Sequence, residues 1–336
     1  MDKNKNRYVH LHVHTEYSVL DGLNKVKLLI DRVKALGMSA CAITDHGTLS
    51  GLIEFYKACK AAEIKPILGM EAYITIDEDD WPNEKKTRDN RHLVLLAMNN
   101  VGLKNLIWLN NRAHLHNFYY SPRICLEHLK THSTGLVALT ACLGGVAGKK
   151  AIYKQDNELE QIGLIYHKDT ESVDDLWKRS EWWIEELSNI FRGKLYLEIQ
   201  DHPNWEQKAY NRWLKQMAEQ RELPMVLTCD AHYPRPEDLE VHQLLMAQQF
   251  KMTLPEYKAK DSFELKNFIR EPEELYQFSA EFKAEEAFWN TAEIAEQCNV
   301  TLELGKYQTP LFDVTKCEDY KDFQKWTSLK QSHGAT

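Results

Sequence analysis

The sequence predicts an α/β protein in which seven strands alternate with helices around a closed or nearly closed barrel, followed by a region of helices alone. Three observations predict this class: short apolar runs recur as far as Thr228, amphipathic stretches separate most of them, and no comparable run follows Pro236. Such alternation indicates a mainly parallel sheet. The predicted strands are Tyr8–His12, Ala40–Thr44, Pro66–Ala72, Leu93–Met98, Gly135–Thr140, Leu195–Ile199 and Pro224–Thr228.

Most intervals between these strands carry apolar residues at i, i+3 and i+4, the spacing of an amphipathic helix. The first helical stretch ends at Gly37, a residue typical of a helix C-terminus. Two intervals are longer, and they contain the exposed-looking sequence HNFYYSPRI and the helix-like sequence KRSEWWIEELSNIFRG. The clearest helical stretches lie at 24–37, 50–65, 102–114 and 204–223.

The chain divides into three predicted regions. Residues 1–235 form the barrel, and residues 236–314 form a separate helical segment that contains PEDLEVHQLLMAQQF, PEELYQFSAEF and EEAFWNTAEIAEQC. Residues 315–336 are polar and are expected to be loosely ordered, as chain ends commonly are.

The composition is that of an ordinary globular protein, with 43% hydrophobic and 27% charged residues. No apolar run approaches the ~18 residues that cross a bilayer, and the N-terminus lacks a signal-peptide pattern. The seven cysteines form no CxxC pair, which favours a reducing cytoplasm. A net charge of −8 argues against a stand-alone electrostatic DNA binder, although bound cations would reverse the local field.

Nine potential metal ligands stand at or near the ends of the predicted strands. A barrel gathers the ends of its parallel strands at one rim, so these side chains are expected to meet there. Nine ligands exceed the coordination number of one ion, which predicts two or three metals and metal-assisted hydrolysis. The nine are His12, His14, Asp21, His46, Glu71, His92, Cys142, Asp230 and His232.

Two same-face patterns carry most of this prediction. Alternate residues of a strand share a face, so HLHVH places three histidines together, of which two need bind metal. The sequence DAH places Asp230 and His232 together in the same way. A lone buried histidine would favour a structural role, whereas an HxH pair at a strand end favours metal binding.

The remaining ligands have structural alternatives. Asp21 stands in an Asp-Gly turn sequence, Glu71 would otherwise need an arginine partner, and a buried Cys142 is by default an inert core residue. His92 alone is weak evidence. In TDHG, Asp45 is either a helix N-cap or a partner that orients His46, and both roles can hold together.

Three further residues are candidates for lining the site. Glu198 and His202 follow the sixth strand in LEIQDH, and Arg123 is a candidate phosphate contact, because a guanidinium forks well onto phosphate oxygens. A surface arginine in a loop is the alternative for Arg123. Phosphate-binding loops of the GxxxxGK[ST] type, GxGxxG turns on strands and GxSxG nucleophile elbows are absent from the sequence.

These motifs, in this order, resemble the PHP (polymerase and histidinol phosphatase) superfamily, and most closely the N-terminal PHP region of the bacterial DNA polymerase III alpha subunit. The resemblance runs from about Tyr8 to Phe312 and rests on VHLHVHTEYSVLDG, ALGMSACAITDHGTLSGLIEFYKACK, IKPILGMEAY, FYYSPRI, LYLEIQDH and NTAEIAEQCNVTLELGKY. It implies a distorted (β/α)7 TIM-like barrel with three divalent metals, Zn, Mn or Fe, at the C-terminal rim. The family's ligand positions fall on the same nine residues.

The resemblance implies a metal-dependent phosphoesterase, with 3′→5′ exonuclease activity on DNA ends as its family-specific form. It implies DNA 3′ ends and a polymerase body or other replication proteins as partners. Polymerase modules are missing from the sequence, so we expect a fragment or a split version, such as one encoded by a phage, that does not polymerise DNA unaided. Two alternatives stay open: a small-molecule phosphomonoesterase of histidinol-phosphatase type, and a non-catalytic, metal-stabilised scaffold of a replicative polymerase.

Overall fold

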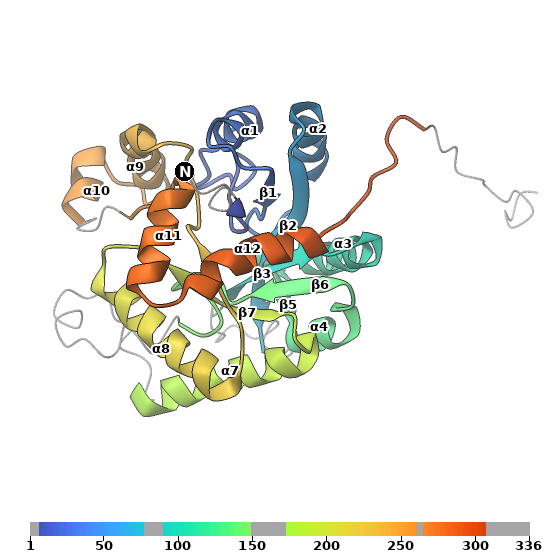
Figure 1. Cartoon of the computed structure of the whole chain (residues 1–336), viewed down its shortest axis with the longest axis vertical. Helices are drawn as coiled ribbons and strands as arrows, with labels where there is room; N and C mark the ends of the chain where they lie inside the picture. The colour runs from blue at the N-terminus through green and yellow to red at the C-terminus, as the bar shows by residue number, and fades with distance from the viewer. Residues whose placement is uncertain (1–6, 77–89, 149–172, 261–264, 307–336) are drawn as a thin grey trace, which may run out of the picture. The chain divides into compact units, whose positions relative to one another are not determined.

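A computed structural model describes residues 7–76, 90–148, 173–260 and 265–306 (Figure 1). Its contacts divide the chain into one unit of Met1–Val300 and another of Thr301–Thr336. The first unit contains both the strand region and the helices that follow it, and a domain boundary at residue 235 remains a prediction. The tail predicted for residues 315–336 lies outside the described residues.

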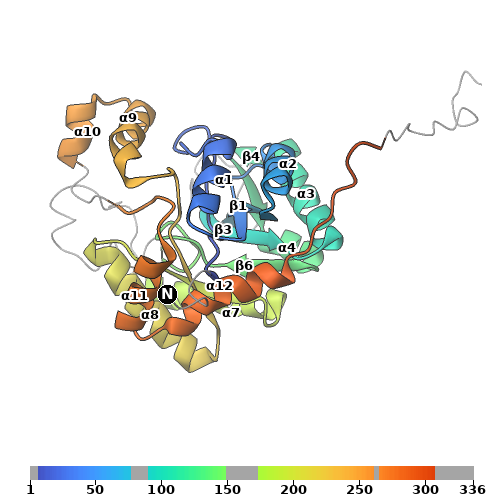
Figure 2. The ribbon, with the colours of Figure 1, turned by 45° about the horizontal axis from the view of Figure 1, so that its top comes forward.

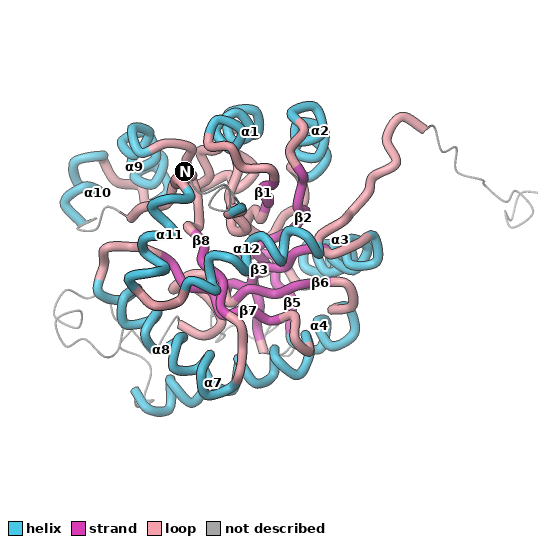
Figure 3. The backbone as a smooth tube through the Cα atoms, viewed as in Figure 1, coloured by secondary structure: helices cyan, strands magenta, loops and turns pink. Residues whose placement is uncertain are grey.

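The fold is of the α/β class. Its strands form one curved sheet in the order β4-β5-β2-β3-β6-β7-β8, with β1 paired to β2. Figure 3 shows the strands gathered together with helices around them. The prediction of a mainly parallel sheet was wrong for β3, which pairs antiparallel with both β2 and β6. The strands are β1 (Ala40–Ile43), β2 (Lys65–Thr75), β3 (Arg91–Ala97), β4 (Phe118–Tyr119), β5 (Ser121–Cys125), β6 (Leu136–Leu139), β7 (Leu195–Gln200) and β8 (Met225–Thr228).

The first predicted strand, Tyr8–His12, is not a regular strand. Its region instead makes isolated parallel bridges, from His10 to Cys41 on one side and from Val13 to Ala231 on the other. The main-chain N–H of His14 also donates to Ala231 O at 2.8 Å. The N-terminal segment therefore lies between β1 and the residues that follow β8 and connects the two.

Helices cover the outside of the sheet, as the 3.6-residue periodicity predicted. The first ends as expected, with Gly37 in the left-handed region at φ +71°. The short helices α4 and α10 and the β4–β5 hairpin were not predicted. The helices are α1 (Val26–Ala35), α2 (Leu52–Ala62), α3 (Asn100–Leu115), α4 (Leu126–His132), α7 (Val173–Phe191), α8 (Trp205–Arg221), η2 (Pro236–Asp238), α9 (Leu239–Gln249), α10 (Leu254–Lys260), α11 (Pro272–Glu281) and α12 (Glu285–Gln297).

The core lies inside the curve of the sheet, where the inward residues of successive strands meet. Leu11, Ile67 and Val226 belong to one buried cluster, which also includes Ile294 and Cys298 from the end of α12. Figure 2 shows α11 and α12 against the strand region, whereas α9 and α10 lie to one side. The final helix therefore completes the core of the strand region.

Within the described residues, no helix is both long enough and apolar enough to cross a membrane.

The contact between α3 and the turn before β6 gives a stability prediction. A Cβ atom on Gly102 would lie 1.9 Å from the main-chain oxygen of Gly135. Alanine normally stabilises a helix by ~1 kcal/mol relative to glycine, but here the clash is expected to destabilise the protein by about 2 kcal/mol or more. Urea unfolding of Gly102→Ala, with Val101→Ala as the neighbouring control, measures this. A more stable Gly102→Ala protein would contradict the close packing.

Candidate metal centre

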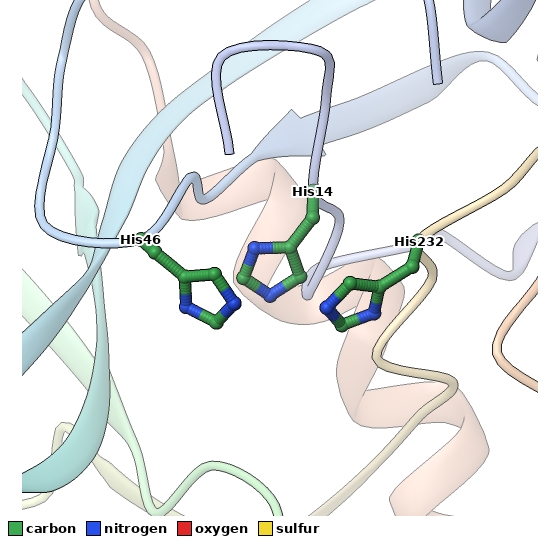
Figure 4. Close-up of side chains that lie close together, drawn as sticks. All are labelled: His14, His46 and His232. Atoms are coloured by element: carbon green, nitrogen blue, oxygen red, sulfur yellow. The ribbon is translucent and has the colours of Figure 1, made fainter. Parts of the chain in front are cut away.

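Sharp turns after the strands deliver several of the predicted ligands to one rim of the sheet. His46 follows β1 and makes a parallel bridge with Glu71 of β2. Asp230 follows β8 with φ +48°, an uncommon conformation for a non-glycine residue that often accompanies functional sites. His14 and His232 come from the two segments that close the sheet. Figure 4 shows the rings of His14, His46 and His232 facing one another.

His92 reaches this rim for a different reason from the one expected. It stands at the beginning of β3 rather than after a strand. Because β3 runs antiparallel to its neighbours, its N-terminal end lies beside the C-terminal ends of β2 and β6. The reversed direction of β3 thus explains why His92, which stands at the beginning of a strand, reaches the same rim as the ligands that follow strands.

Glu71 is the centre of the cluster. Its carboxylate oxygens lie 3.2 Å from His12 Nε2, 2.5 Å from His46 Nδ1, 3.0 Å from His92 Nδ1 and 3.7 Å from His14 Nε2. Glu71 lies within β2, four residues before its end, and is 1% exposed. A carboxylate so deeply buried among imidazoles is suited to bridging cations.

A second carboxylate, Asp230, faces Glu71 across the two N-terminal histidines. Asp230 Oδ1 lies 3.2 Å from His12 Nε2 and 3.1 Å from His14 Nε2. The same oxygen is 3.6 Å from His232 Nδ1. Of the three histidines in HLHVH, His12 and His14 enter the cluster, whereas the His10 ring bonds to the main-chain oxygen of Arg270.

Asp21 and Cys142 complete the set from opposite sides. Asp21 Oδ2 lies 3.2 Å from His46 Nε2, and Asp21 Oδ1 lies 4.0 Å from His232 Nε2. The Cys142 thiol lies 3.9 Å from His92 Nδ1. All nine predicted side chains therefore form one continuous set of contacts of 4.0 Å or less.

The spacing of these atoms fits metal ions. Three groups have ligand atoms within 4.8 Å of one another: His14, His46 and His232; His12, His14 and Glu71; and His46, Glu71 and His92. Ligands bound at ~2.1 Å in a tetrahedral or octahedral shell lie roughly 3.0–3.4 Å apart, which matches the contacts of His12 Nε2. Within the described residues, the buried oxygens Asp21 Oδ1, Glu71 Oε2 and Asp230 Oδ1 make no hydrogen bond.

The charges of the cluster are strongly coupled. Burial, together with the neighbouring His46 and His232, lowers the pKa of His14 to about 3. Burial would raise the pKa of Glu71, but the facing histidines His92, His46 and His12 hold it well below its usual range. Glu71 is therefore ionised and His14 neutral near pH 7, which are the forms that bind metal.

His12 is oriented by a carboxylate that the sequence marked only as lining the site. Glu198 is fully buried, and its Oε1 accepts from His12 Nδ1 at 2.7 Å. Thr228 Oγ1 donates to the same oxygen at 2.5 Å, and Gln200 Nε2 donates at 2.9 Å. This places the His12 proton on Nδ1 and leaves Nε2 to face Glu71 and Asp230, as in carboxylate–histidine–metal arrangements.

His14 is oriented by a hydroxyl that sequence reasoning missed. Ser18 Oγ donates to Asp45 Oδ1 at 2.8 Å, so it accepts from His14 Nδ1 at 3.1 Å and from the main-chain N–H of His46 at 3.1 Å. Asp45 also accepts from Thr15 N and Thr15 Oγ1 at 2.6 and 2.7 Å. Asp45 therefore anchors the turn beside the cluster. Because Thr15 and Ser18 lie in a loop, no periodicity in the sequence identified them.

Ser18→Ala tests this positioning role. We expect metal affinity to fall roughly 10- to 100-fold, the usual effect of losing such a partner, because His14 loses the acceptor that fixes its tautomer. Competition with a chromophoric chelator measures the affinity. Ser50→Ala, which removes an exposed hydroxyl that bonds to the nearby Thr48 at 2.8 Å, is the matched control. Equal affinities for both variants would remove Ser18 from the centre.

Arg123 and His202 lie outside the continuous set of contacts described above. Arg123 is 1% exposed and belongs to β5, so the alternative of a surface arginine in a loop was wrong. Its guanidinium lies over the Tyr119 ring, 5.2 Å from the centroid. His202 Nδ1 accepts from the main-chain N–H of Lys266 at 3.2 Å. Catalytic roles for Asp45, Arg123, Glu198 and His202 stay predictions.

Fold and site together define an α/β protein with a buried histidine–carboxylate cluster, suited to metal ions, at one rim of a curved sheet. The PHP domain family matches residues 10–202, which is more than half of the chain. The chain therefore belongs to the PHP domain family.

Curated relatives extend the similarity beyond that region. The chain is 36% identical to the DNA polymerase III subunit alpha of Aquifex aeolicus over 96% of its length, and 37% identical to that of Thermus aquaticus over 92%. The subunit of Helicobacter pylori is 36% identical over 90%. The chain spans 27%, 24% and 24% of these three proteins, respectively.

Solved structures resemble the fold more distantly. One is a two-domain protein of Bacteroides vulgatus whose description predicts a PHP-like metal-dependent phosphoesterase, at 12% identity and TM-score 0.39 over 90% of this chain and 72% of that one. Another is an amidohydrolase of Chromobacterium violaceum, at 16% identity and TM-score 0.36 over 69% and 89%. Similarity at this level carries no argument about chemistry.

Proposed function

We propose that this chain hydrolyses phosphoesters with a cluster of divalent metal ions held by the nine rim residues. One observation carries the proposal: two buried carboxylates, Glu71 and Asp230, face the same pair of imidazoles, His12 and His14, at 3.1–3.7 Å. Core packing does not call for four such groups in contact. Metals bound there would supply an activated water near neutral pH and would offset charge on the phosphate oxygens.

We further propose three metal ions, because the ligand atoms form three overlapping groups. Each pair of groups has one residue in common, which is His14, His46 or Glu71. The bonds of Glu198 to His12 Nδ1 and of Ser18 to His14 Nδ1 direct both Nε2 atoms at the centre, where metal ions would bind them. The imidazoles and the Cys142 thiol suit Zn²⁺, and the carboxylates also admit Mn²⁺ or Fe.

The proposed substrate is a phosphodiester at the 3′ end of DNA, cleaved in the 3′→5′ direction. The similarity to polymerase III alpha subunits supports this choice, because a hydrolytic site beside a DNA-synthesising body would meet 3′ ends. A polymerase body and other replication proteins are the proposed partners. A cation cluster would attract the DNA backbone locally despite the net charge of −8.

Comparing two substrates tests the proposal. Metal-replete protein is expected to shorten a 3′-recessed oligonucleotide one nucleotide at a time and to turn over an aryl phosphate monoester at least about 100-fold more slowly in kcat/KM. His12→Ala with retained circular dichroism should abolish both reactions. Faster turnover of the monoester would favour a small-molecule phosphomonoesterase. If metal-loaded protein is inactive toward both substrates, the result would favour a non-catalytic, metal-stabilised scaffold instead.

A further inference from the structure

The β4–β5 hairpin presents two exposed aromatic rings. Phe118 is 59% exposed and Tyr120 is 64% exposed, although large apolar side chains are usually covered in a folded domain. Tyr120 is the single residue between β4 and β5 and has φ +60°. Bulky residues rarely adopt this conformation, and such strain collects at sites that contact ligands.

This hairpin stands beside the metal centre. Gly47 follows His46 directly, and its main-chain oxygen bonds to His114 Nε2 at 2.7 Å. The His114 ring in turn lies 6.3 Å from the Phe118 ring, centroid to centroid. A Cβ atom on Gly47 would lie only 2.6 Å from Pro122 Cγ, which shows how closely the hairpin packs against the residue after His46.

The sheet also connects the β4–β5 hairpin to the metal centre. The Tyr73 ring lies 5.2 Å from the His92 ring and 6.0 Å from the His46 ring, centroid to centroid. Tyr73 pairs in register with Arg123 of β5, one strand away. The hairpin is therefore fixed to the rim by both its main chain and its neighbouring strand.

The base of the hairpin is held rigidly, which leaves its tip to present the rings. The buried Arg123 guanidinium lies over the Tyr119 ring at 5.2 Å, and the Tyr119 ring meets the Tyr120 ring edge-on at 4.7 Å and 89°. A rigid aromatic surface loses little side-chain entropy when a flat ligand binds.

We propose that Phe118 and Tyr120 form a stacking surface for the base of a DNA nucleotide whose phosphate lies at the metal centre. This inference rests on the proposed function. It explains how the site would prefer an unpaired DNA end to a phosphoester that carries no base. Stacking of bases on aromatic rings is the usual way in which proteins hold single strands without reading their sequence. The contacts above place these two exposed rings close to His46.

Fluorescence of 2-aminopurine at the terminal 3′ position of a single-stranded oligonucleotide tests this directly. A phosphorothioate at the last linkage slows hydrolysis, and Mn²⁺ is supplied as the metal. Binding to the wild-type chain should quench the fluorescence. Phe118→Ala and Tyr120→Ala should each raise Kd roughly tenfold and reduce the quenching. Phe118→Leu keeps an apolar residue of similar size and should lose the quenching as well, whereas Phe118→Trp should keep it.

Phe250→Ala is the matched control, because Phe250 is an aromatic residue at the end of α9 with a similar exposed fraction, 53%. An oligonucleotide with an abasic 3′ terminus should bind the wild-type chain about tenfold more weakly and should show no further loss with Phe118→Ala. Wild-type quenching that is absent, or that survives in all three aromatic-removing variants, would overturn the stacking surface. Quenching that depends on Phe118 in a chain without hydrolytic activity would support this surface and refute the proposed hydrolysis separately.

Discussion

Replacing Glu71 with glutamine is expected to lower phosphodiester hydrolysis by at least about 100-fold, the scale on which single groups that stabilise transition-state charge act. The carboxylate contacts His12, His14, His46 and His92, so its loss removes one shared ligand from two of the three candidate groups. Glutamine keeps the shape of the side chain but binds divalent cations far more weakly than a carboxylate. Steady-state kinetics on a 3′-recessed oligonucleotide, together with elemental analysis, measures both effects.

Glu63→Gln is the control for this substitution, since Glu63 is an exposed residue at the end of α2. It removes the same charge from the protein far from the cluster and should leave metal content and kcat/KM within about twofold of wild type. A Glu71→Gln protein with a full complement of metal and normal turnover would show that Glu71 is not shared between ions.

Removal of metal is expected to produce the largest change in stability. An ion present at 1,000 times its dissociation constant stabilises the folded state by ~4 kcal/mol per site. Without cations, the cluster holds Glu71 and Asp230 in the interior beside imidazoles, and among the described residues Glu71 Oε2 and Asp230 Oδ1 make no hydrogen bond. Chelation should therefore lower the melting temperature by roughly 5–10 °C for each such ion removed, as differential scanning calorimetry would measure.

The same scan on Glu71→Gln separates this effect from any general action of the chelator. The variant should respond to chelation with a much smaller shift, because it binds fewer ions before treatment. Equal shifts in the variant and the wild type would place the stabilising metal elsewhere in the protein.

Local patterns in the sequence were sufficient to predict most of the fold. Apolar runs and i, i+3, i+4 spacing located the strands β1, β2, β7 and β8, and the helices α2 and α8, to within a few residues. The direction of β3 was not predictable in this way. A strand has the same apolar pattern in either direction, and only pairing with β2 and β6 reverses it.

The first predicted strand failed for a related reason. Tyr8–His12 has the composition of a strand, but its neighbours offer only single bridges at Cys41 and, through Val13, at Ala231. The one-residue turn at Tyr120 was also missed, because aromatic residues in the left-handed region give no turn signal.

Within the candidate site, the strand-end residues were predictable and the groups that orient them were not. HxH and DxH place two side chains on one face wherever the chain is extended, so His12, His14, Asp230 and His232 could be expected together. Ser18 and Thr228 act through hydrogen bonds that form only when distant parts of the chain fold together. Glu198 was identified as lining the site, but its bond to His12 depends on β7 meeting the distant N-terminal segment.

Anomalous scattering from crystals of metal-loaded protein tests the central claim most directly. Data collected at the zinc, manganese and iron absorption edges would locate each ion and identify its element. We predict anomalous peaks among His12, His14, Glu71 and Asp230 and among the ligands that extend to Cys142 and Asp21. A fully loaded crystal without any peak within bonding distance of Glu71 or Asp230 would contradict the proposed centre.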